Sequence, residues 1–335
     1  MTDQTKAFWQ GKKVLVTGAG GFIASHLVEA LVLNGAAVRA FVRYNSRGDP
    51  GLLSMLPRKV YDQVEVVAGD LRDLPAILAA LRSVSYVFHL GALIAIPYSY
   101  LHPAEVVESN IMGTLNVLLA GRETRVDRIV HTSTSEVYGT ALRVPIDETH
   151  PLQGQSPYSA SKIGADKLAE SFYRAFDLPV VTLRPFNTYG PRQSARAVIP
   201  TIITQALTQE LIRLGNLEAR RDLTYVADTV AGFLKVAAAP GVEGETFNLG
   251  TGCEVRIREL AEQVIALIGK PVRIEVDEAR LRPEKSEVQR LLADNRLARQ
   301  RLGWQPQTSL RAGLSQTIDW ISRHLHLYKP DRYQV

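Results

Sequence analysis

The sequence lacks the features of disulfide-stabilised, secreted or membrane proteins. Its 335 residues include one cysteine, Cys253, so no internal disulfide can form, and a reducing compartment is the simplest interpretation. No apolar run reaches the roughly 18 residues that a membrane-spanning helix requires. Residues 1–10 carry acid and amide groups without the apolar core of a signal peptide. We therefore expect a cytoplasmic protein that does not enter a membrane.

Long basic runs and basic stripes interleaved with aromatic residues are also missing, so we expect no nucleic-acid partner. The net charge of +5 fits either an ordinary basic surface or polyanionic ligands, such as nucleotides with a pyrophosphate. There is no internal repeat and no low-complexity segment, and we assign no metal-ligating residues. A content of 46% hydrophobic and 22% charged residues suits one or two globular domains.

The first motif is a glycine-rich turn between a predicted strand and a predicted helix. Residues 12–17 form an apolar, β-rich run typical of a buried parallel strand, and a helical period covers residues 21–34. Glycines between them permit a tight turn and let backbone N–H groups approach a pyrophosphate at the helix N-terminus. The spacing is Gly-x-x-Gly-x-x-Ala, which differs from the main Rossmann fingerprint. We assign cofactor contacts to Gly18, Gly20, Gly21, Phe22 and Ile23.

The end of the second predicted strand, residues 38–42, indicates which dinucleotide is bound. An NAD site usually has an acid here to hold the ribose hydroxyls. This chain has Arg43, with Ser46 and Arg47 nearby, and such basic and hydroxyl groups can hold a 2′-phosphate. NADP is therefore favoured over NAD, although Arg43 could instead stack on the adenine or face solvent.

Two further predicted strand ends supply cofactor contacts. After the strand at 64–67, Asp70 is expected to accept a hydrogen bond from the adenine amino group, with Leu71 beside it. Asp73 is expected to cap the next helix. After the strand at 86–90, Ala92 is small enough for close backbone approach to the nicotinamide half.

Residues 131–162 carry the candidate catalytic groups. Tyr158 and Lys162 are four apart, which places both side chains on one face of a helix. An ammonium near a phenol lowers the pKa of the tyrosine and makes it a usable base near neutrality. A strand at 127–132 brings Thr134, Ser135 and Glu136 to the carboxyl edge of the sheet, where ligands of open α/β sheets bind. A bare Tyr-x-x-x-Lys spacing is common by chance, so its weight depends on the other motifs.

Strands and helices alternate as far as a sixth strand at 180–183, which predicts an α/β fold with a doubly wound parallel (Rossmann) sheet. We place the NAD(P)-binding domain at residues 1–185 and a smaller, partly interleaved C-terminal α/β substrate domain at residues 186–335. Arg192, Arg221 and Arg282 are candidates to bind a second anion, if all three lie in non-helical turns facing one cleft. Further helices are expected at 103–122, 158–176, 198–210, 226–239, 257–269 and 310–324.

Together these motifs resemble the extended short-chain dehydrogenase/reductases that act on nucleotide sugars, the epimerase/dehydratase family, over nearly the whole chain. Residues 17–23 look like its cofactor loop, the Tyr158/Lys162 pair like its catalytic pair, and residues 184–191 and 221–228 like its nucleotide-sugar segments.

The resemblance also implies which residues bind substrate and how the chain assembles. Asn187, Arg221 and Arg282 would contact the diphosphate or ribose of a nucleotide-diphosphate sugar, and residues 197–199, which include Val198, would lie along the base. The family commonly forms homodimers through helices like those at 103–122 and 158–176.

The residues after the fifth strand separate the reactions of this family. Simple 4-epimerases have a Ser/Thr run there, whereas 4,6-dehydratases have Thr-Asp-Glu, or Thr-Ser-Glu in the GDP-mannose enzymes. Thr134-Ser135-Glu136 resembles the second dehydratase form. Residues 42–46 resemble the same NADP-using enzymes, and residues 192–197 resemble dehydratases of legionaminic-acid-type pathways, which act on nucleotide-linked N-acetylglucosamine. We therefore expect a nucleotide-sugar 4,6-dehydratase acting on UDP- or GDP-N-acetylglucosamine.

In the implied reaction Tyr158 takes the proton of the sugar 4-hydroxyl, which Thr134 orients, while hydride leaves carbon 4. Glu136 then removes the proton on carbon 5, water leaves carbon 6 with a proton from Ser135 or Glu136, and hydride returns to carbon 6. A 4-epimerase needs only the Tyr, Lys and Ser/Thr parts and is the first alternative, since Glu136 could simply accept backbone N–H bonds. A non-catalytic redox-sensing member is a remote alternative, because such members commonly lose the Tyr or the Lys.

Overall fold

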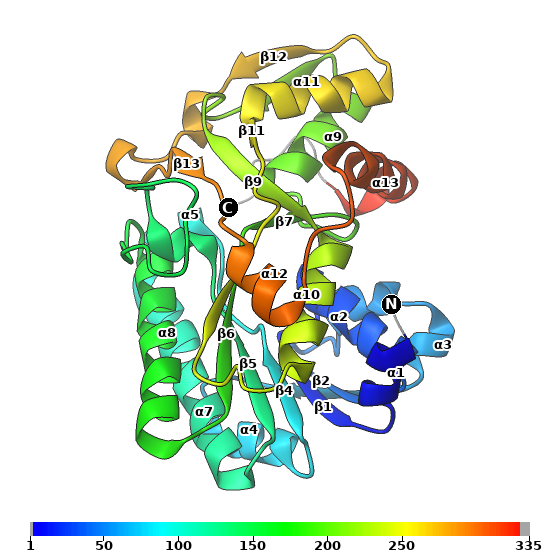
Figure 1. The fold of residues 1–335 in the computed structure, drawn as a ribbon. Helices are drawn as coiled ribbons and strands as arrows, with labels where there is room; N and C mark the ends of the chain where they lie inside the picture. Colours follow the sequence, from blue (N-terminus) through cyan, green and yellow to red (C-terminus); the bar gives the residue numbers. More distant parts are fainter. Residues whose placement is uncertain (1–2, 329–335) are drawn as a thin grey trace.

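The computed structural model describes residues 3–328, in which a large sheet with helices on both faces carries a smaller group of strands and helices at one end (Figure 1). All seven strands of the large sheet are parallel, in the order β10-β6-β5-β4-β1-β2-β3. This is the strand order of a doubly wound dinucleotide-binding sheet, extended by β10, so the predicted fold class is confirmed. The strands are β1 (Lys13–Thr17), β2 (Ala37–Arg43), β3 (Val64–Gly69), β4 (Tyr86–His89), β5 (Arg128–Thr132), β6 (Val180–Pro185) and β10 (Thr246–Leu249).

Burial on both faces explains why the strands of this sheet are continuously apolar. In β1, Val14 and Val16 belong to one hydrophobic cluster and Leu15 to another, and all three side chains are fully buried. The first cluster lies under α2 (Phe22–Leu33) and α10 (Val226–Ala238), and the second under α4 (Leu74–Leu81), α7 (Gly113–Thr124) and α8 (Pro157–Phe176). The helices thus cover the two faces of the sheet separately (Figure 1).

The helix expected at residues 103–122 is interrupted. It begins as α6 (Pro103–Val107), passes through a π-helical turn, η2 (Glu108–Met112), and continues as α7, with α5 (Ile96–Leu101) before it. The π turn contains Asn110. Single π turns inside helices are frequent at functional sites. Two further helices, α1 (Asp3–Trp9) and α3 (Arg58–Tyr61), complete the N-terminal half with the 3-10 turn η1 (Gly51–Met55).

The smaller part is built around β9 (Arg220–Tyr225), which pairs with β7 (Asn187–Tyr189), β11 (Glu254–Arg256) and β13 (Arg290–Leu291). Residues 184–193, which include one of the segments that resemble nucleotide-sugar segments, contain the end of β6 and all of β7. The boundary predicted at residue 185 stays a prediction, although α10 and β10 return from beyond it to the large sheet. The remaining elements are β8 (Leu211–Leu214), β12 (Arg273–Val276), α9 (Val198–Thr208), α11 (Ile257–Ile268), α12 (Arg296–Leu302), α13 (Leu310–Arg323), and the 3-10 turns η4 (Glu278–Arg280), η5 (Glu284–Ser286) and η6 (Leu325–Leu327).

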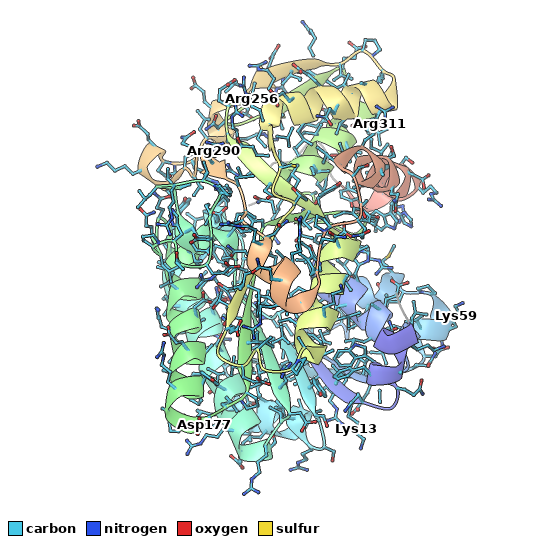
Figure 2. The ribbon with its side chains drawn as sticks, in the orientation of Figure 1. Lys13, Lys59, Asp177, Arg256, Arg290 and Arg311 are labelled. Atoms are coloured by element: carbon cyan, nitrogen blue, oxygen red, sulfur yellow. The ribbon has the colours of Figure 1, made fainter. Side chains whose placement is uncertain are left out.

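Charged side chains project outward from both parts of the molecule. Lys59, Asp177 and Arg311 are exposed and lie on widely separated elements (Figure 2). Among residues 3–328, no helix is both long and apolar enough to cross a bilayer.

Candidate active site

The carboxyl end of β5 leads into the short turn η3 (Ser135–Tyr138), and this turn with its N-cap holds three of the candidate catalytic residues. Thr134 is the N-cap of this turn, and its Oγ1 accepts the N–H of Glu136 at 3.2 Å. Ser135 is buried, whereas Thr134 and Glu136 are only partly buried. The Tyr158 hydroxyl is hydrogen-bonded to the Thr134 side chain, and the Glu136 carboxylate acts on Tyr158 electrostatically. The structure therefore brings Thr134, Glu136 and Tyr158 together.

The start of α8 is fixed by its own sequence, and this places Tyr158 and Lys162. Ser156 accepts the N–H of Ser159 at 3.0 Å, while Ser159 Oγ accepts the N–H of Ser156 at 2.9 Å, which is a capping box. Pro157 occupies the first helical position, where its missing N–H is not needed. Tyr158 and Lys162 follow one turn apart, 7% and 3% exposed.

The pKa values of the pair differ from the expectation. Burial raises the pKa of Tyr158 despite the hydrogen bond from Thr134, and the carboxylates of Glu136 and Asp166 raise it further. Burial also lowers the pKa of Lys162 to about 8, and Asp166 opposes this shift. The prediction that Lys162 lowers the pKa of Tyr158 is wrong for the chain alone, because the cost of desolvating a buried phenolate is the larger effect.

The glycine-rich turn has the geometry that a dinucleotide pyrophosphate requires. Gly18 has a positive φ of 65°, and a Cβ there would lie 2.6 Å from the Gly91 Cα. A Cβ on Gly20 would lie 2.7 Å from the Pro50 carbonyl oxygen. The N-cap of α2, Gly21, provides no side-chain cap, so the N–H groups at this helix start are available to an anion. Phe22 and Ile23 are the first residues of that helix.

The residues assigned to the adenosine half lie at the ends of β2 and β3. The Arg43 side chain is 65% exposed and lies 3.4 Å from the Glu105 carboxylate, and Ser46 is exposed. Asp70 binds Arg72 through both carboxylate oxygens, at 2.7 and 3.0 Å, and this lowers the pKa of Asp70 to about 2. Its contact with adenine stays a prediction.

Residues near the nicotinamide half are packed tightly. A Cβ on Gly91 would lie 2.7 Å from Leu71 Cδ1, so Leu71 lies against the backbone that follows β4. Ala92 is the next residue along and is partly buried. Asp73 caps α4 through the N–H of Ala76 at 3.4 Å, as predicted.

Two of the three candidate anion-binding arginines lie near each other. Arg221 is 8% exposed, its Nη2 lies 3.2 Å from Glu287 Oε1, and it interacts electrostatically with Glu136 and Arg282. Arg282 Nη1 and Asn187 Oδ1 are buried, and neither has a hydrogen-bond partner among residues 3–328. Buried polar atoms without partners are rare in proteins, so each of these two is a candidate contact for a polar ligand.

The expectation that the three arginines occupy turns is wrong for Arg221, which lies in the strand β9. Arg192 lies in a turn with a positive φ of 67°, and its side chain binds Glu29 of α2 at 2.7 Å. That the three face one cleft stays a prediction. Val198 is the first residue of α9 and is partly buried.

Several polar residues around the site were missed in the sequence. Asn110 in the π turn donates to Ser161 Oγ at 2.9 Å and accepts the N–H of Leu93 at 2.8 Å, so it links the segment after β4 to α8. Asp166 follows Lys162 by one helical turn, and that spacing was a signal for its position beside the pair. Glu287 pairs with Arg221, and this pairing had no local signal in the sequence.

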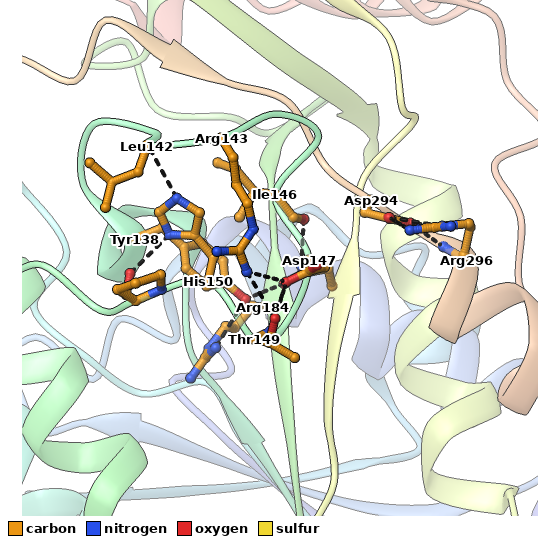
Figure 3. Close-up of polar contacts among 12 residues, drawn as sticks. Tyr138, Leu142, Arg143, Ile146, Asp147, Thr149, His150, Arg184, Asp294 and Arg296 are labelled. Atoms are coloured by element: carbon orange, nitrogen blue, oxygen red, sulfur yellow. Dashed lines mark hydrogen bonds and ion pairs between the residues drawn. The ribbon is translucent and has the colours of Figure 1, made fainter.

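A separate cavity of about 350 Å³ lies beyond the catalytic pair. Its lining includes Glu148, His150, Arg184 and Asp166 but neither Tyr158 nor Lys162. Figure 3 shows Arg184 below Tyr138 and His150 in this region. His150 accepts the Leu142 N–H at 3.0 Å, which fixes the loop between η3 and α8. Among the described residues, no group of three or more His, Cys, Asp or Glu side chains is placed to hold a metal ion.

Comparisons with known proteins give one consistent result. The family model for GDP-mannose 4,6 dehydratase matches residues 15–317. The chain is 33% identical over 319 residues to a UDP-glucose 4-epimerase of Mycolicibacterium smegmatis, covering 92% of this chain and 98% of that protein. It is 30% identical over 328 residues to a dTDP-D-glucose 4,6-dehydratase of Mus musculus, covering 95% and 91%.

Solved structures agree with these sequence relatives. Epimerase Mth375 of Methanothermobacter thermautotrophicus superposes with a TM-score of 0.88 at 30% identity, covering 97% of this chain and 96% of that one. The dTDP-glucose 4,6-dehydratase DesIV of Streptomyces venezuelae, solved with NAD bound, gives a TM-score of 0.84 at 30% identity, covering 96% and 100%.

Proposed function

Because the chain belongs to the nucleotide-sugar 4,6-dehydratase and epimerase family of extended short-chain dehydrogenase/reductases, we propose that it is an NAD(P)-dependent nucleotide-sugar 4,6-dehydratase. The observation that carries the proposal is the position of Glu136, next to the Thr134–Tyr158 hydrogen bond and within electrostatic reach of Arg221. A carboxylate there can act on a sugar whose 4-hydroxyl faces Tyr158 and whose diphosphate faces Arg221.

In the proposed mechanism Tyr158 removes the proton of the sugar 4-hydroxyl, and Thr134 orients that hydroxyl. The turn around Gly18 would hold the dinucleotide, which would supply a hydride acceptor for carbon 4 and a hydride donor for carbon 6. The carbon 4 ketone acidifies the proton on carbon 5, which Glu136 removes. The carbon 6 hydroxyl leaves as water, with its proton supplied by Glu136 or through Ser135. Carbon 5 regains a proton as hydride adds to carbon 6, which balances the proton that Tyr158 took from the 4-hydroxyl, and the product is a 4-keto-6-deoxy sugar. Lys162 supplies positive charge one turn from Tyr158, which would favour the phenolate, although in the chain alone burial raises the pKa of Tyr158.

The proposed substrate is a nucleoside-diphosphate sugar, held by Arg221, Arg282 and Asn187. Arginine suits a diphosphate because its planar fork can donate two parallel hydrogen bonds. The unpaired Arg282 Nη1 and Asn187 Oδ1 provide a donor and an acceptor for the diphosphate and ribose. Val198 would lie along the base, and Arg192 would act through its ion pair with Glu29. We propose UDP- or GDP-N-acetylglucosamine as the sugar nucleotide, from the likeness of residues 192–197 and Arg43 to the legionaminic-acid-type dehydratases.

For the cofactor we propose NADP in preference to NAD. Arg43 is exposed and its interaction with Glu105 is long, so its guanidinium can turn to a 2′-phosphate with Ser46 beside it. The same carboxylate of Glu105 opposes a 2′-phosphate, and DesIV was solved with NAD. Titration calorimetry with NADP and NAD measures which of these effects is larger.

We also propose that the chain is a cytoplasmic homodimer, paired through α6, α7 and α8. Three apolar side chains on or next to these helices are exposed, Leu101 at 67%, Val107 at 42% and Met112 at 46%. A second copy would bury them. Light scattering after size exclusion tests the assembly, since replacing Val107 and Met112 by serine should yield monomers.

A 4-epimerase is the second candidate function, favoured by the relative from Mycolicibacterium smegmatis. Incubation with a panel of UDP-, GDP- and dTDP-hexoses and N-acetylhexosamines, followed by mass spectrometry, separates the two. A dehydratase releases a product lighter by one water, and an epimerase releases an isomer of equal mass. A panel that yields only isomers contradicts the dehydratase proposal.

A further inference from the structure

We propose that Asp166 is a positioning residue, which joins the catalytic turn η3 to the catalytic helix α8 and serves as the buried counter-ion of Lys162. The inference rests on the proposed function because it concerns the same Tyr158–Lys162 pair. It goes further by assigning a role to a residue that contacts neither substrate nor cofactor in the proposed mechanism.

Asp166 is placed to act on Lys162 by the helix that carries both. It follows Lys162 by four residues on α8, so the two side chains lie one turn apart on the same buried face. Asp166 is 5% exposed and Lys162 is 3% exposed. A carboxylate buried this deeply must be paired and hydrogen-bonded to be tolerated.

The first partners of Asp166 come from the segment that leads into the catalytic turn. His131 Nε2 lies 3.0 Å from Asp166 Oδ1, and Ser133 Oγ donates to Oδ2 at 2.8 Å. Ser133 directly precedes Thr134, which hydrogen-bonds Tyr158. One carboxylate on α8 therefore holds the backbone that presents Thr134 to Tyr158.

The remaining partner comes from β6 and reaches the other end of the turn. Arg184 donates to Asp166 Oδ2 through Nη2 at 2.9 Å and Nε at 3.2 Å, and through Nη1 to the Tyr138 hydroxyl at 2.9 Å. Tyr138, the last residue of η3, donates in turn to Asn248 Oδ1 of β10 at 2.8 Å. The turn is thus held at both ends by groups that meet at Asp166.

The charges of this cluster make Asp166 the group that balances two cations. Lys162 and Arg184 are positive. Burial raises the pKa of Asp166, but the hydrogen bond with His131 and the neighbouring cations outweigh burial and lower that pKa to about 2, so Asp166 is negative. His131 on β5 and His89 on β4 both face Lys162, and burial lowers the pKa of each, so neither adds a charge near neutrality.

Removing the Asp166 charge would leave two cations in a buried cluster. Burial already lowers the pKa of Lys162 to about 8, and the Asp166 charge limits that shift. Of the other acid groups, Glu136 acts on Tyr158 and Arg221, and Tyr158 is neutral because burial raises its pKa. Without Asp166, Lys162 would lose its proton close to neutral pH.

The experiment measures the Lys162 proton directly in the whole protein. Lysine labelled with ¹³C at Cε is followed by NMR across pH, and the Lys162 signal is assigned by its absence in Lys162→Arg. Asp166→Asn preserves the size of the side chain and removes its charge. The pKa of Lys162 should therefore fall by about one unit or more, which is the usual effect of losing a neighbouring opposite charge. Ser133→Ala is the matched control, because it removes one hydrogen bond to Asp166 and leaves the charge.

Arg184→Gln is a second variant, in which the pKa of Lys162 should shift in the opposite direction. It removes the competing cation and frees Asp166 for Lys162, so the pKa of Lys162 should rise. If Asp166→Asn does not fold, the Arg184→Gln result decides alone. A Lys162 pKa that moves by less than 0.3 units in every variant that folds overturns the proposal.

The readout requires no substrate and is therefore independent of the proposed reaction. Absence of dehydration with an intact Lys162 shift would contradict only the proposed function. Normal dehydration with an unmoved Lys162 would contradict only the role of Asp166. A purely structural Asp166 would lower the melting temperature in Asp166→Asn and Ser133→Ala alike without moving the Lys162 pKa, and this outcome also overturns the proposal.

Discussion

Replacing Glu136 by glutamine should divide the proposed reaction into its two halves. Gln has the size of Glu, and residue 136 is held in the turn by backbone groups, since its N–H donates to Thr134 and its carbonyl accepts the Gly139 N–H, so the fold of η3 should persist. Tyr158 and Lys162 are untouched, so hydride transfer from carbon 4 should continue. Removal of the carbon 5 proton loses its base, and elimination should stop.

The size of the expected rate loss in Glu136→Gln follows from the usual contribution of a general base. Such a group contributes roughly 10²–10⁴-fold to the rate, which corresponds to about 3–5 kcal/mol of activation free energy at 1.36 kcal/mol per factor of ten. Dehydration by Glu136→Gln should therefore fall by about that factor, while the dissociation constant of the cofactor stays within a factor of two or so, since Glu136 does not approach the glycine turn.

Loss of the Glu136 charge should also change the pH dependence of the first half-reaction. The Glu136 carboxylate raises the pKa of Tyr158, and Tyr158 acts as a base in its deprotonated form. The half-reaction therefore gains rate as pH rises through the Tyr158 pKa, and in Glu136→Gln this rise should occur at lower pH.

The assay follows reduced cofactor by its absorbance at 340 nm after rapid mixing with substrate, together with product mass. Glu136→Gln should accumulate up to one equivalent of reduced cofactor per site and release almost no dehydrated sugar. Glu148→Gln is a matched control, because Glu148 binds the Asn248 N–H at the separate cavity and should leave elimination unchanged. Normal turnover by Glu136→Gln would refute the reasoning.

Three further substitutions test the binding sites. Arg221→Met should raise KM for the sugar nucleotide by roughly 10- to 100-fold, because a hydrogen bond to a charged group is lost. Arg220→Met is the control, since Arg220 lies on the same strand but is 41% exposed, and its KM should not change. Equal changes of KM in the two variants would contradict this prediction. Gly18→Ala should abolish cofactor binding in calorimetry, because its Cβ meets backbone at 2.6 Å, whereas Gly48→Ala, with a positive φ but open space, should retain it. Arg43→Ala should weaken NADP binding about tenfold or more and leave NAD binding unchanged, and parallel losses would remove the case for a 2′-phosphate contact.

The large sheet could be predicted because its signals are local. A strand buried on both faces is continuously apolar, as in Val14, Leu15 and Val16. A glycine turn followed by a helical period then predicts that a helix follows this strand. The six predicted strands end within two residues of the observed ones. The π turn at Glu108–Met112 has no such signal, since one inserted residue leaves the helical composition unchanged.

The strand β9 could not be predicted from its composition. It begins Arg-Arg-Asp, yet Arg221 and Asp222 are buried because their partners come from distant segments. Arg221 pairs with Glu287, and Asp222 accepts the N–H groups of Thr251, Gly252 and Ala293. Only the folded chain reveals these partners.

The candidate site shows the same division between local and distant causes. The helical spacing of Tyr158 and Lys162 follows from the sequence, and the capping box of Ser156 makes it reliable. The direction in which the Tyr158 pKa is shifted does not follow from the sequence, because the burial of Tyr158 depends on elements distant in the chain. The role of Asp166 was likewise hidden, since its partners His131 and Arg184 lie 35 and 18 residues from it in the chain.

The most direct test of the central claim follows the hydride itself. A sugar nucleotide that the substrate panel identifies is prepared with deuterium at carbon 4, incubated with the protein, and the product is examined by NMR and mass spectrometry. The account predicts a product lighter by one water that carries the deuterium at carbon 6. Deuterium retained at carbon 4 of an isomer of equal mass would contradict it.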